Sequence, residues 1–226
     1  VGGLKSHDDV FTRLRLFTGH NSSQVFMFVN IEGQGRHSFR DDGWRDLFGT
    51  ADFYTYLRAG ASSAHTFFFR TSATAGWSVE TPFQLTLGGR EAVRGFYEDD
   101  IPGARRVLFT LEDRIFLNWP SPDVVDFGFT LFADVGRMWA GEVPYGTNSG
   151  WRGSAGFGLR MGFPASTRAV GRIDLAFPIN DPISRGPVFR VTLIELLGIG
   201  SGFRDHQLQK ALRNPVGPDL FLTPMR

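Results

Sequence analysis

The chain has 226 residues, with 24 Lys and Arg against 23 Asp and Glu, 28 glycines, 23 phenylalanines and no cysteine. The balanced charge gives no sign of a nucleic-acid partner, and the lack of cysteine excludes disulfides and thiolate metal sites in these residues. No apolar run approaches the roughly 18 to 20 residues of a membrane-spanning helix, and the start of the chain lacks a signal-peptide core. Abundant glycine and phenylalanine instead suit strands with one apolar face.

Strands are predicted along most of the chain, in two groups separated by a long segment at about 77–103. The period of two is clearest at 125–135, where the odd positions are apolar and the even ones include Asp126, Thr130 and Asp134. A polar tail is expected at 201–226, with one short helical stretch near 207–213. We expect the strands at about 8–18, 22–34, 46–59, 65–76, 105–117, 125–135, 151–163, 168–177 and 188–197.

Strand length separates two interpretations of this alternation. A soluble sandwich also alternates, but its strands usually have about five or six residues. The predicted strands run to ten or more, about what a tilted strand needs to cross a bilayer. Tryptophans near the predicted strand ends suit the interfacial girdle of a membrane barrel, although they would also suit the rim of a soluble core. These tryptophans are Trp77, Trp119, Trp139 and Trp151.

The predicted fold class is all-β, an antiparallel transmembrane β-barrel. A sheet in lipid must close, because an open edge leaves backbone groups unpaired. Roughly nine strands make an odd and small number for a bacterial single-chain barrel. We therefore expect residues 1–200 to form part of a larger barrel.

An arginine between glycines stands out in the long segment, in the sequence LGGREAVRGF at 87–96. Arg94 is followed by Gly95, which allows a close backbone approach or a positive φ, and by Phe96, which can pack. An arginine held inside a barrel needs carboxylate partners. Glu112 and Asp134 have the parity to face the lumen from adjacent strands, so we expect them to pair with Arg94. The alternative is that Arg94 lies on a solvated loop.

These residues resemble a known family. The segment Val93 to Phe96, the Glu112 strand and the sequence FADVG at 132–136 are similar to the C-terminal barrel of the BamA-type outer-membrane assembly factors, also called bacterial surface antigens. The resemblance spans about 22–198. It implies a sixteen-stranded barrel, of which this chain holds about the last nine strands, without the first seven and without the periplasmic POTRA repeats.

The resemblance also implies a loop that folds into the lumen at about 77–103 and acts as a latch. The latch residues would be Val93, Arg94, Gly95 and Phe96. The residues that receive them would be Glu112, Phe132, Asp134 and Gly136.

By the same resemblance, the protein would lie in the bacterial outer membrane and insert or translocate other outer-membrane proteins without ATP or a cofactor. Its partners would be the lipid bilayer, unfolded outer-membrane protein clients and accessory lipoproteins. Two alternatives stay open: a two-partner-secretion or solute pore, and the membrane anchor of an N-terminal patatin-like hydrolase. The polar tail after the last predicted strand departs from the family pattern.

Other candidate sites are weaker. The clusters His7 to Asp9 and Glu98 to Asp100 could bind a divalent cation, but acidic loop clusters are usually solvated. Ser154 lies in GSAG and not in the GxSxG of a nucleophile elbow, so no catalytic or metal residue is expected and the chain is not expected to be an enzyme. Inward arginines could select anions, but pairing with Glu112, Asp134 and Asp174 is the simpler expectation. These arginines are Arg152, Arg160, Arg168 and Arg172.

Overall fold

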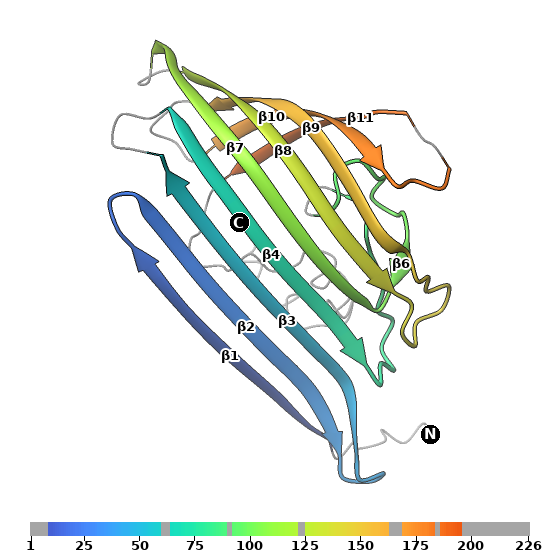
Figure 1. Ribbon diagram of the computed structural model, residues 1–226. Helices are drawn as coiled ribbons and strands as arrows, with labels where there is room; N and C mark the ends of the chain where they lie inside the picture. The colour runs from blue at the N-terminus through green and yellow to red at the C-terminus, as the bar shows by residue number, and fades with distance from the viewer. Residues whose placement is uncertain are drawn as a thin grey trace, which may run out of the picture.

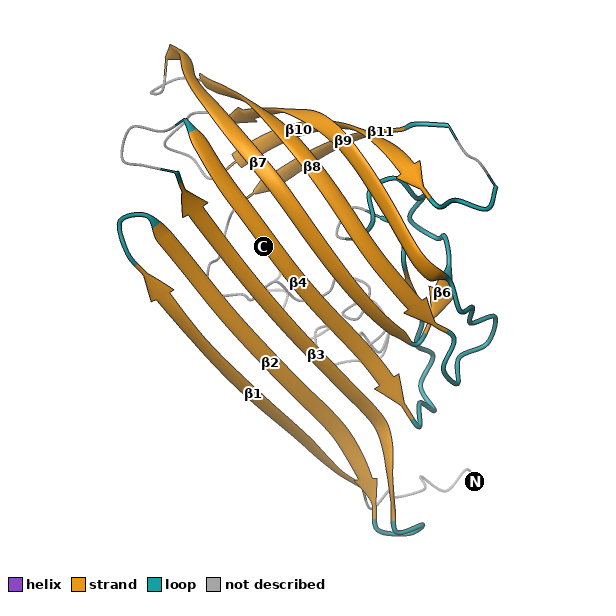
Figure 2. Cartoon of the chain, viewed as in Figure 1, coloured by secondary structure: helices purple, strands orange, loops and turns teal. Residues whose placement is uncertain are grey.

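The computed structural model describes residues 9–59, 64–89, 92–121, 125–162, 169–183 and 186–195, and every regular element in them is a β-strand (Figure 2). Nine long strands form one sheet in the order β1-β2-β3-β4-β7-β8-β9-β10-β11, and every neighbouring pair is antiparallel. Their bounds are β1 Asp9–Asn21, β2 Val25–Ser38, β3 Gly43–Arg58, β4 His65–Trp77, β7 Arg105–Ser121, β8 Val125–Trp139, β9 Gly150–Gly162, β10 Ala169–Ile179 and β11 Val188–Glu195. The all-β, antiparallel prediction is confirmed, and each expected strand is present.

Within the described ranges, no helix is long and apolar enough to cross a membrane. The predicted tail at 201–226, with its short helical stretch, lies outside the described residues.

Side chains alternate between an apolar exposed face and a polar buried face. On β8, Phe129 and Leu131 are 48% and 57% exposed, whereas Thr130 and Asp134 are 0% and 2% exposed. The exposed large hydrophobics recur on neighbouring strands, as at Leu111 and Phe157. A continuous apolar outer face of this extent marks a surface that lies against something other than water, and lipid is the simplest match.

The sheet is curved, and among the described residues it does not close (Figure 1). β1 pairs with β2 at one edge and β11 pairs with β10 at the other. Several strands run past their predicted ends, because alternation continues to the rim. In β8, Arg137 still faces outward, with its guanidinium 4.9 Å from the ring of Trp139 and 6.0 Å from that of Trp151. Such amphipathic pairs suit the boundary between lipid and water.

The segment between β4 and β7 folds against the inner face of the sheet. It contains the short strands β5 (Leu85–Thr86) and β6 (Pro102–Gly103), which pair with each other. The sequence did not predict them, because two residues have no detectable period. Apolar side chains of this segment form a buried cluster with residues of the sheet. The loop contributes Phe83, Leu85, Leu87, Val93 and Phe96, and the strands contribute Phe48, Leu108 and Met138.

The alternation leads to a labelling prediction. A nitroxide on a cysteine at Phe129 should be reached by lipid-soluble quenchers in membranes, because this side chain lies on the apolar outer face. The same label at Thr130, on the opposite face, should be protected from them. Accessibility in continuous-wave electron paramagnetic resonance measures both. The reverse ranking would contradict the assignment of the outer face to lipid.

Candidate functional site

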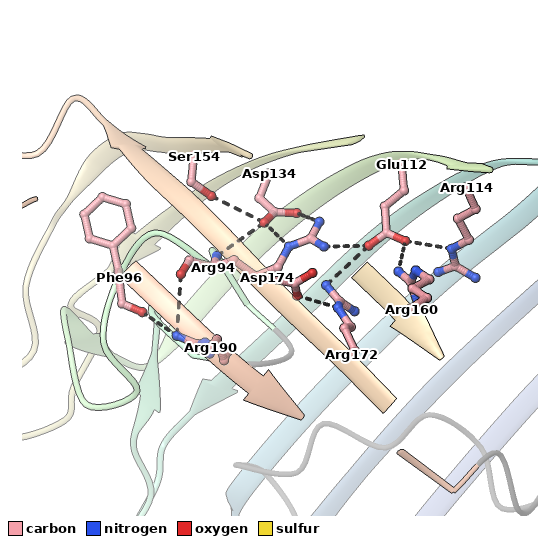
Figure 3. A network of polar contacts seen from close by, with 10 residues as sticks. All are labelled: Arg94, Phe96, Glu112, Arg114, Asp134, Ser154, Arg160, Arg172, Asp174 and Arg190. Atoms are coloured by element: carbon pink, nitrogen blue, oxygen red, sulfur yellow. Dashed lines mark hydrogen bonds and ion pairs between the residues drawn. The ribbon is translucent and has the colours of Figure 1, made fainter. Parts of the chain in front are cut away.

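The tip of the loop between β5 and β6 lies on the inner face of the second group of strands (Figure 3). Its backbone is organised by short-range contacts: Gly88 and Val93 form a parallel bridge, and the Val93 N–H donates to the carbonyl oxygen of Leu87. Val93 and Phe96 are both fully buried in the apolar cluster. With Val93 and Phe96 packed in this way, Arg94 is directed at the strand wall.

Arg94 joins acids of two adjacent strands. Its Nε and Nη2 donate to the two carboxylate oxygens of Asp134 on β8, at 2.6 and 2.7 Å, in a fork that matches the carboxylate geometry. Its Nη1 donates to Oε1 of Glu112 on β7 at 2.7 Å. The side chains of Arg94, Glu112 and Asp134 are 3%, 2% and 2% exposed, so all three charges are removed from water. The pairing that parity suggested is thus present as a direct contact.

Glu112 is shared by four arginines. Besides Arg94, Arg114 contacts Oε2 at 2.7 Å, Arg160 contacts Oε2 at 2.8 Å, and Arg172 lies 3.6 Å from Oε1. Arg172 also donates to Asp174 on its own strand. The prediction that inward arginines pair with these acids therefore holds for Arg160 and Arg172. One carboxylate thus ties the loop to β7, β9 and β10.

Phe132 packs against the guanidinium of Arg94. The ring centroid of Phe132 lies 3.6 Å from Cζ of Arg94, a close cation–π contact. The ring has room there because its neighbour on β9 is Gly156: a Cβ at that position would come within 2.6 Å of the ring. A glycine, an aromatic ring and a guanidinium are thus stacked in that order.

Two glycines let the loop approach the wall. A Cβ at Gly136 would come within 2.8 Å of the side chains of Leu87 and Leu108 and within 3.0 Å of Val93. A Cβ at Gly95 would come within 2.7 Å of the Ser154 Cβ on β9 and 3.0 Å of the Pro178 Cα on β10. Of the two roles considered for Gly95, close approach is the one observed, since the described glycines with positive φ lie elsewhere.

The close approach predicts that Gly95→Ala destabilises the docked loop, because the backbone of Pro178 cannot move aside as a flexible side chain would. We expect a loss of about 1–3 kcal/mol, the usual cost of overpacking. Urea unfolding of the full-length protein in detergent would measure it. Gly33→Ala is the matched control, because nothing lies within 4 Å of a Cβ built at Gly33. Equal stability of the two variants would argue against a tightly packed tip.

The acid partners of Arg94 keep its guanidinium positively charged. Burial by itself would lower the pKa of the guanidinium, because the charged form loses solvation. The neighbouring carboxylates of Asp134 and Glu112 outweigh burial, so that the pKa of Arg94 is raised above its ordinary value. The loop arginine therefore remains charged wherever its acid partners are ionised.

Some of the other candidate residues lie elsewhere. Arg152 donates to the carbonyl oxygen of Asn180 and not to an acid, whereas Ser154 lies 3.4 Å from Asp134. Asp100 accepts from the Tyr97 N–H within its own turn. Arg168, His7 and Asp8 lie outside the described residues. In the ranges that the structure describes, no three His, Cys, Asp or Glu side chains are grouped to hold a metal ion.

Sequence reasoning missed three residues that hold the loop. Asp46 on β3 accepts from the backbone N–H groups of Glu80 and Thr81, and Arg106 on β7 donates to the Thr86 carbonyl oxygen at 2.6 Å. Arg190 on β11 contacts the tip itself. Their inward parity was a readable signal, but parity does not name a partner on a loop.

Fold and site together define a class of protein: a long-stranded antiparallel sheet with an apolar outer face, as in membrane β-barrels, that carries a loop folded onto its inner face. A comparison with protein families matches residues 47–193, from within β3 to within β11, to the Omp85 superfamily domain. The chain belongs to the Omp85 superfamily, whose members are barrel and transport proteins of outer-membrane protein insertion or secretion, in bacteria or in organelles. A comparison with curated proteins found no match.

Proposed function

We propose that this chain is the C-terminal part of a sixteen-stranded barrel of the BamA type, which inserts other outer-membrane proteins into the bacterial outer membrane. The observation that carries the proposal is the buried contact of Arg94 with Glu112 and Asp134 over the ring of Phe132. Its partners would be the bilayer, unfolded outer-membrane protein clients and accessory lipoproteins.

In this proposal the loop is a latch. The latch segment, Val93 to Phe96, would brace the strands that follow it, with Glu112, Phe132, Asp134 and Gly136 as its receptor. A buried ion pair with a forked geometry favours one docked position, because any other position would leave charges without partners in a low dielectric. The latch would keep the strands that follow it in their arrangement while client strands pair with β11.

The edge would act by strand pairing. In the proposed barrel, β11, which among the described residues pairs with β10 alone, would meet the first strand of the barrel in a seam, and its exposed side chains Phe189 and Val191 are apolar. An unpaired edge is a template on which another strand can add through main-chain hydrogen bonds. Client strands would pair at this edge and move into the bilayer, and the step would need neither ATP nor a cofactor, because hydrogen bonds and lipid burial supply the free energy.

The test is folding of a client by the full-length protein in liposomes. An unfolded outer-membrane barrel added from outside should reach its heat-modifiable, protease-resistant form faster with the protein present than in empty liposomes. Transport of a soluble polypeptide into the vesicle lumen without client folding would favour the secretion alternative. Hydrolysis of lipid by the full-length protein would favour the patatin-linked anchor.

A further inference from the structure

Arg190 reaches from the last strand of the sheet to the tip of the loop. Its Nη2 donates to the carbonyl oxygen of Phe96 at 3.0 Å and lies 3.5 Å from that of Arg94 (Figure 3). These two carbonyl groups flank Gly95, the residue that touches the wall. A single guanidinium nitrogen thus contacts the main chain on both sides of Gly95.

The direction of this side chain is informative. The residue directly opposite Arg190 on β10 is Asp174, an acid at the cross-strand position where ion pairs can form. Asp174 instead accepts a hydrogen bond from Arg172, and Arg190 extends to the loop carbonyls. Hydrogen bonds from a charged donor to main-chain carbonyls are stronger than neutral ones, and they depend on the loop backbone lying in its docked position.

The contacts of the tip extend in order across the wall. Arg94 reaches β7 and β8 through Glu112 and Asp134, and Gly95 lies against β9 and β10 through Ser154 and Pro178. Arg190 adds β11, the strand at the edge. Among the described residues, β11 pairs with β10 alone. A tie from the loop therefore restrains β11 from the inner face of the sheet, in addition to its pairing with β10.

We propose that Arg190 is a positioning residue that ties the loop tip to β11, so that the docked loop holds the edge strand in place. The inference rests on the proposed function only in that client strands would pair at β11; the contact between Arg190 and the loop is a property of the fold. The loop would then have a second role besides the Arg94 ion pairs: the main chain of its tip would hold β11 through the hydrogen bonds that Arg190 donates.

The experiment measures two distances by pulsed electron paramagnetic resonance in the full-length protein, with nitroxides on introduced cysteines. One pair, Phe129 with Val191, joins the outer faces of β8 and β11, both exposed. The other pair, Phe129 with Tyr97, joins β8 to the exposed part of the loop. Arg190→Gln is compared with the wild type, and Arg152→Gln is the matched control, because Arg152 donates to the carbonyl oxygen of Asn180 and not to a carbonyl of the loop.

The proposal requires that Arg190→Gln lose the narrow distance distribution between Phe129 and Val191 and keep the one between Phe129 and Tyr97, because Arg94 still docks the loop. Arg152→Gln should keep both. If Arg190→Gln does not fold, Arg190→Lys is measured, and the same loss to a smaller degree is required. An unchanged Phe129 to Val191 distribution would overturn the tie, and broadening of both pairs would overturn its local action.

Failure of the tie and failure of the proposed function give different results. If wild-type protein folds clients in liposomes but Arg190→Gln leaves the edge strand unchanged, the tie alone is refuted. If the edge strand loosens as required but the wild-type protein folds no client, the tie stands and the assembly function is refuted.

Discussion

Replacing Arg94 with alanine is expected to destabilise the folded protein by about 3–5 kcal/mol, the usual cost of removing one partner of a buried ion pair. The reason is Asp134, whose carboxylate is 2% exposed and receives both of its forked hydrogen bonds from Arg94. Glu112 loses less, because Arg114 and Arg160 still contact it. If the latch proposal holds, client folding should fall together with stability.

Urea or heat unfolding, followed by the heat-dependent migration of the barrel in gels, would measure this loss. Arg45→Ala is the matched control: Arg45 also contacts two carboxylates, Asp41 and Glu80, but on the surface, where such pairs contribute little. The double variant Arg94→Ala with Asp134→Asn should recover part of the lost stability, because it removes the unpaired carboxylate. If Arg94→Ala were as stable as the wild type, the loop would be an ordinary solvated connection and the prediction would be wrong.

Glu112→Gln is expected to be at least as damaging, although the change keeps the shape of the side chain. Four arginines contact this carboxylate, and the same cluster holds two other acids, Asp134 and Asp174. Neutralising Glu112 leaves four cations, two buried and two partly buried, against two anions, and like charges in a low dielectric repel strongly. We expect a loss of about 3–5 kcal/mol or failure to fold, and a larger loss than for Asp134→Asn.

The same unfolding measurement, run on Glu112→Gln, Asp134→Asn and Glu80→Gln, tests this ranking. Glu80 is the control because its carboxylate is 59% exposed and pairs at the surface with Arg45. The expected order of damage is Glu112, then Asp134, then Glu80. If Asp134→Asn were the most destabilising, the loop pair would matter more than the shared acid, and Glu112 would not be the centre of the cluster.

The strands of this protein are readable in its sequence. Alternation over ten or more residues, as from Val125 to Val135, is a local property of the chain, and so is the side of the sheet on which each residue falls. Parity alone put Glu112 and Asp134 on the inner face, and the neighbouring strands β7 and β8 carry them there. Strand ends were less readable, because rim residues such as Arg137 and Trp139 still alternate.

Other features depend on residues far apart in the chain. The short strands β5 and β6 have no period, and they exist because the loop packs its own apolar cluster against Phe48 and Met138. Parity brings several acids and arginines inward, but it does not say that four arginines would share Glu112 or that Arg190 would pass Asp174 to reach the loop.

The sequence by itself determined the strand pattern, the apolar outer face and the inward acids, because these follow from a period of two within each strand. Only the tertiary structure decided where the loop docks, because docking depends on where the curved sheet places Gly136, Gly156 and Pro178 relative to the tip. Glycines at 95 in the loop and at 136 and 156 in the sheet leave room for this docking, and that room is a property of several segments together.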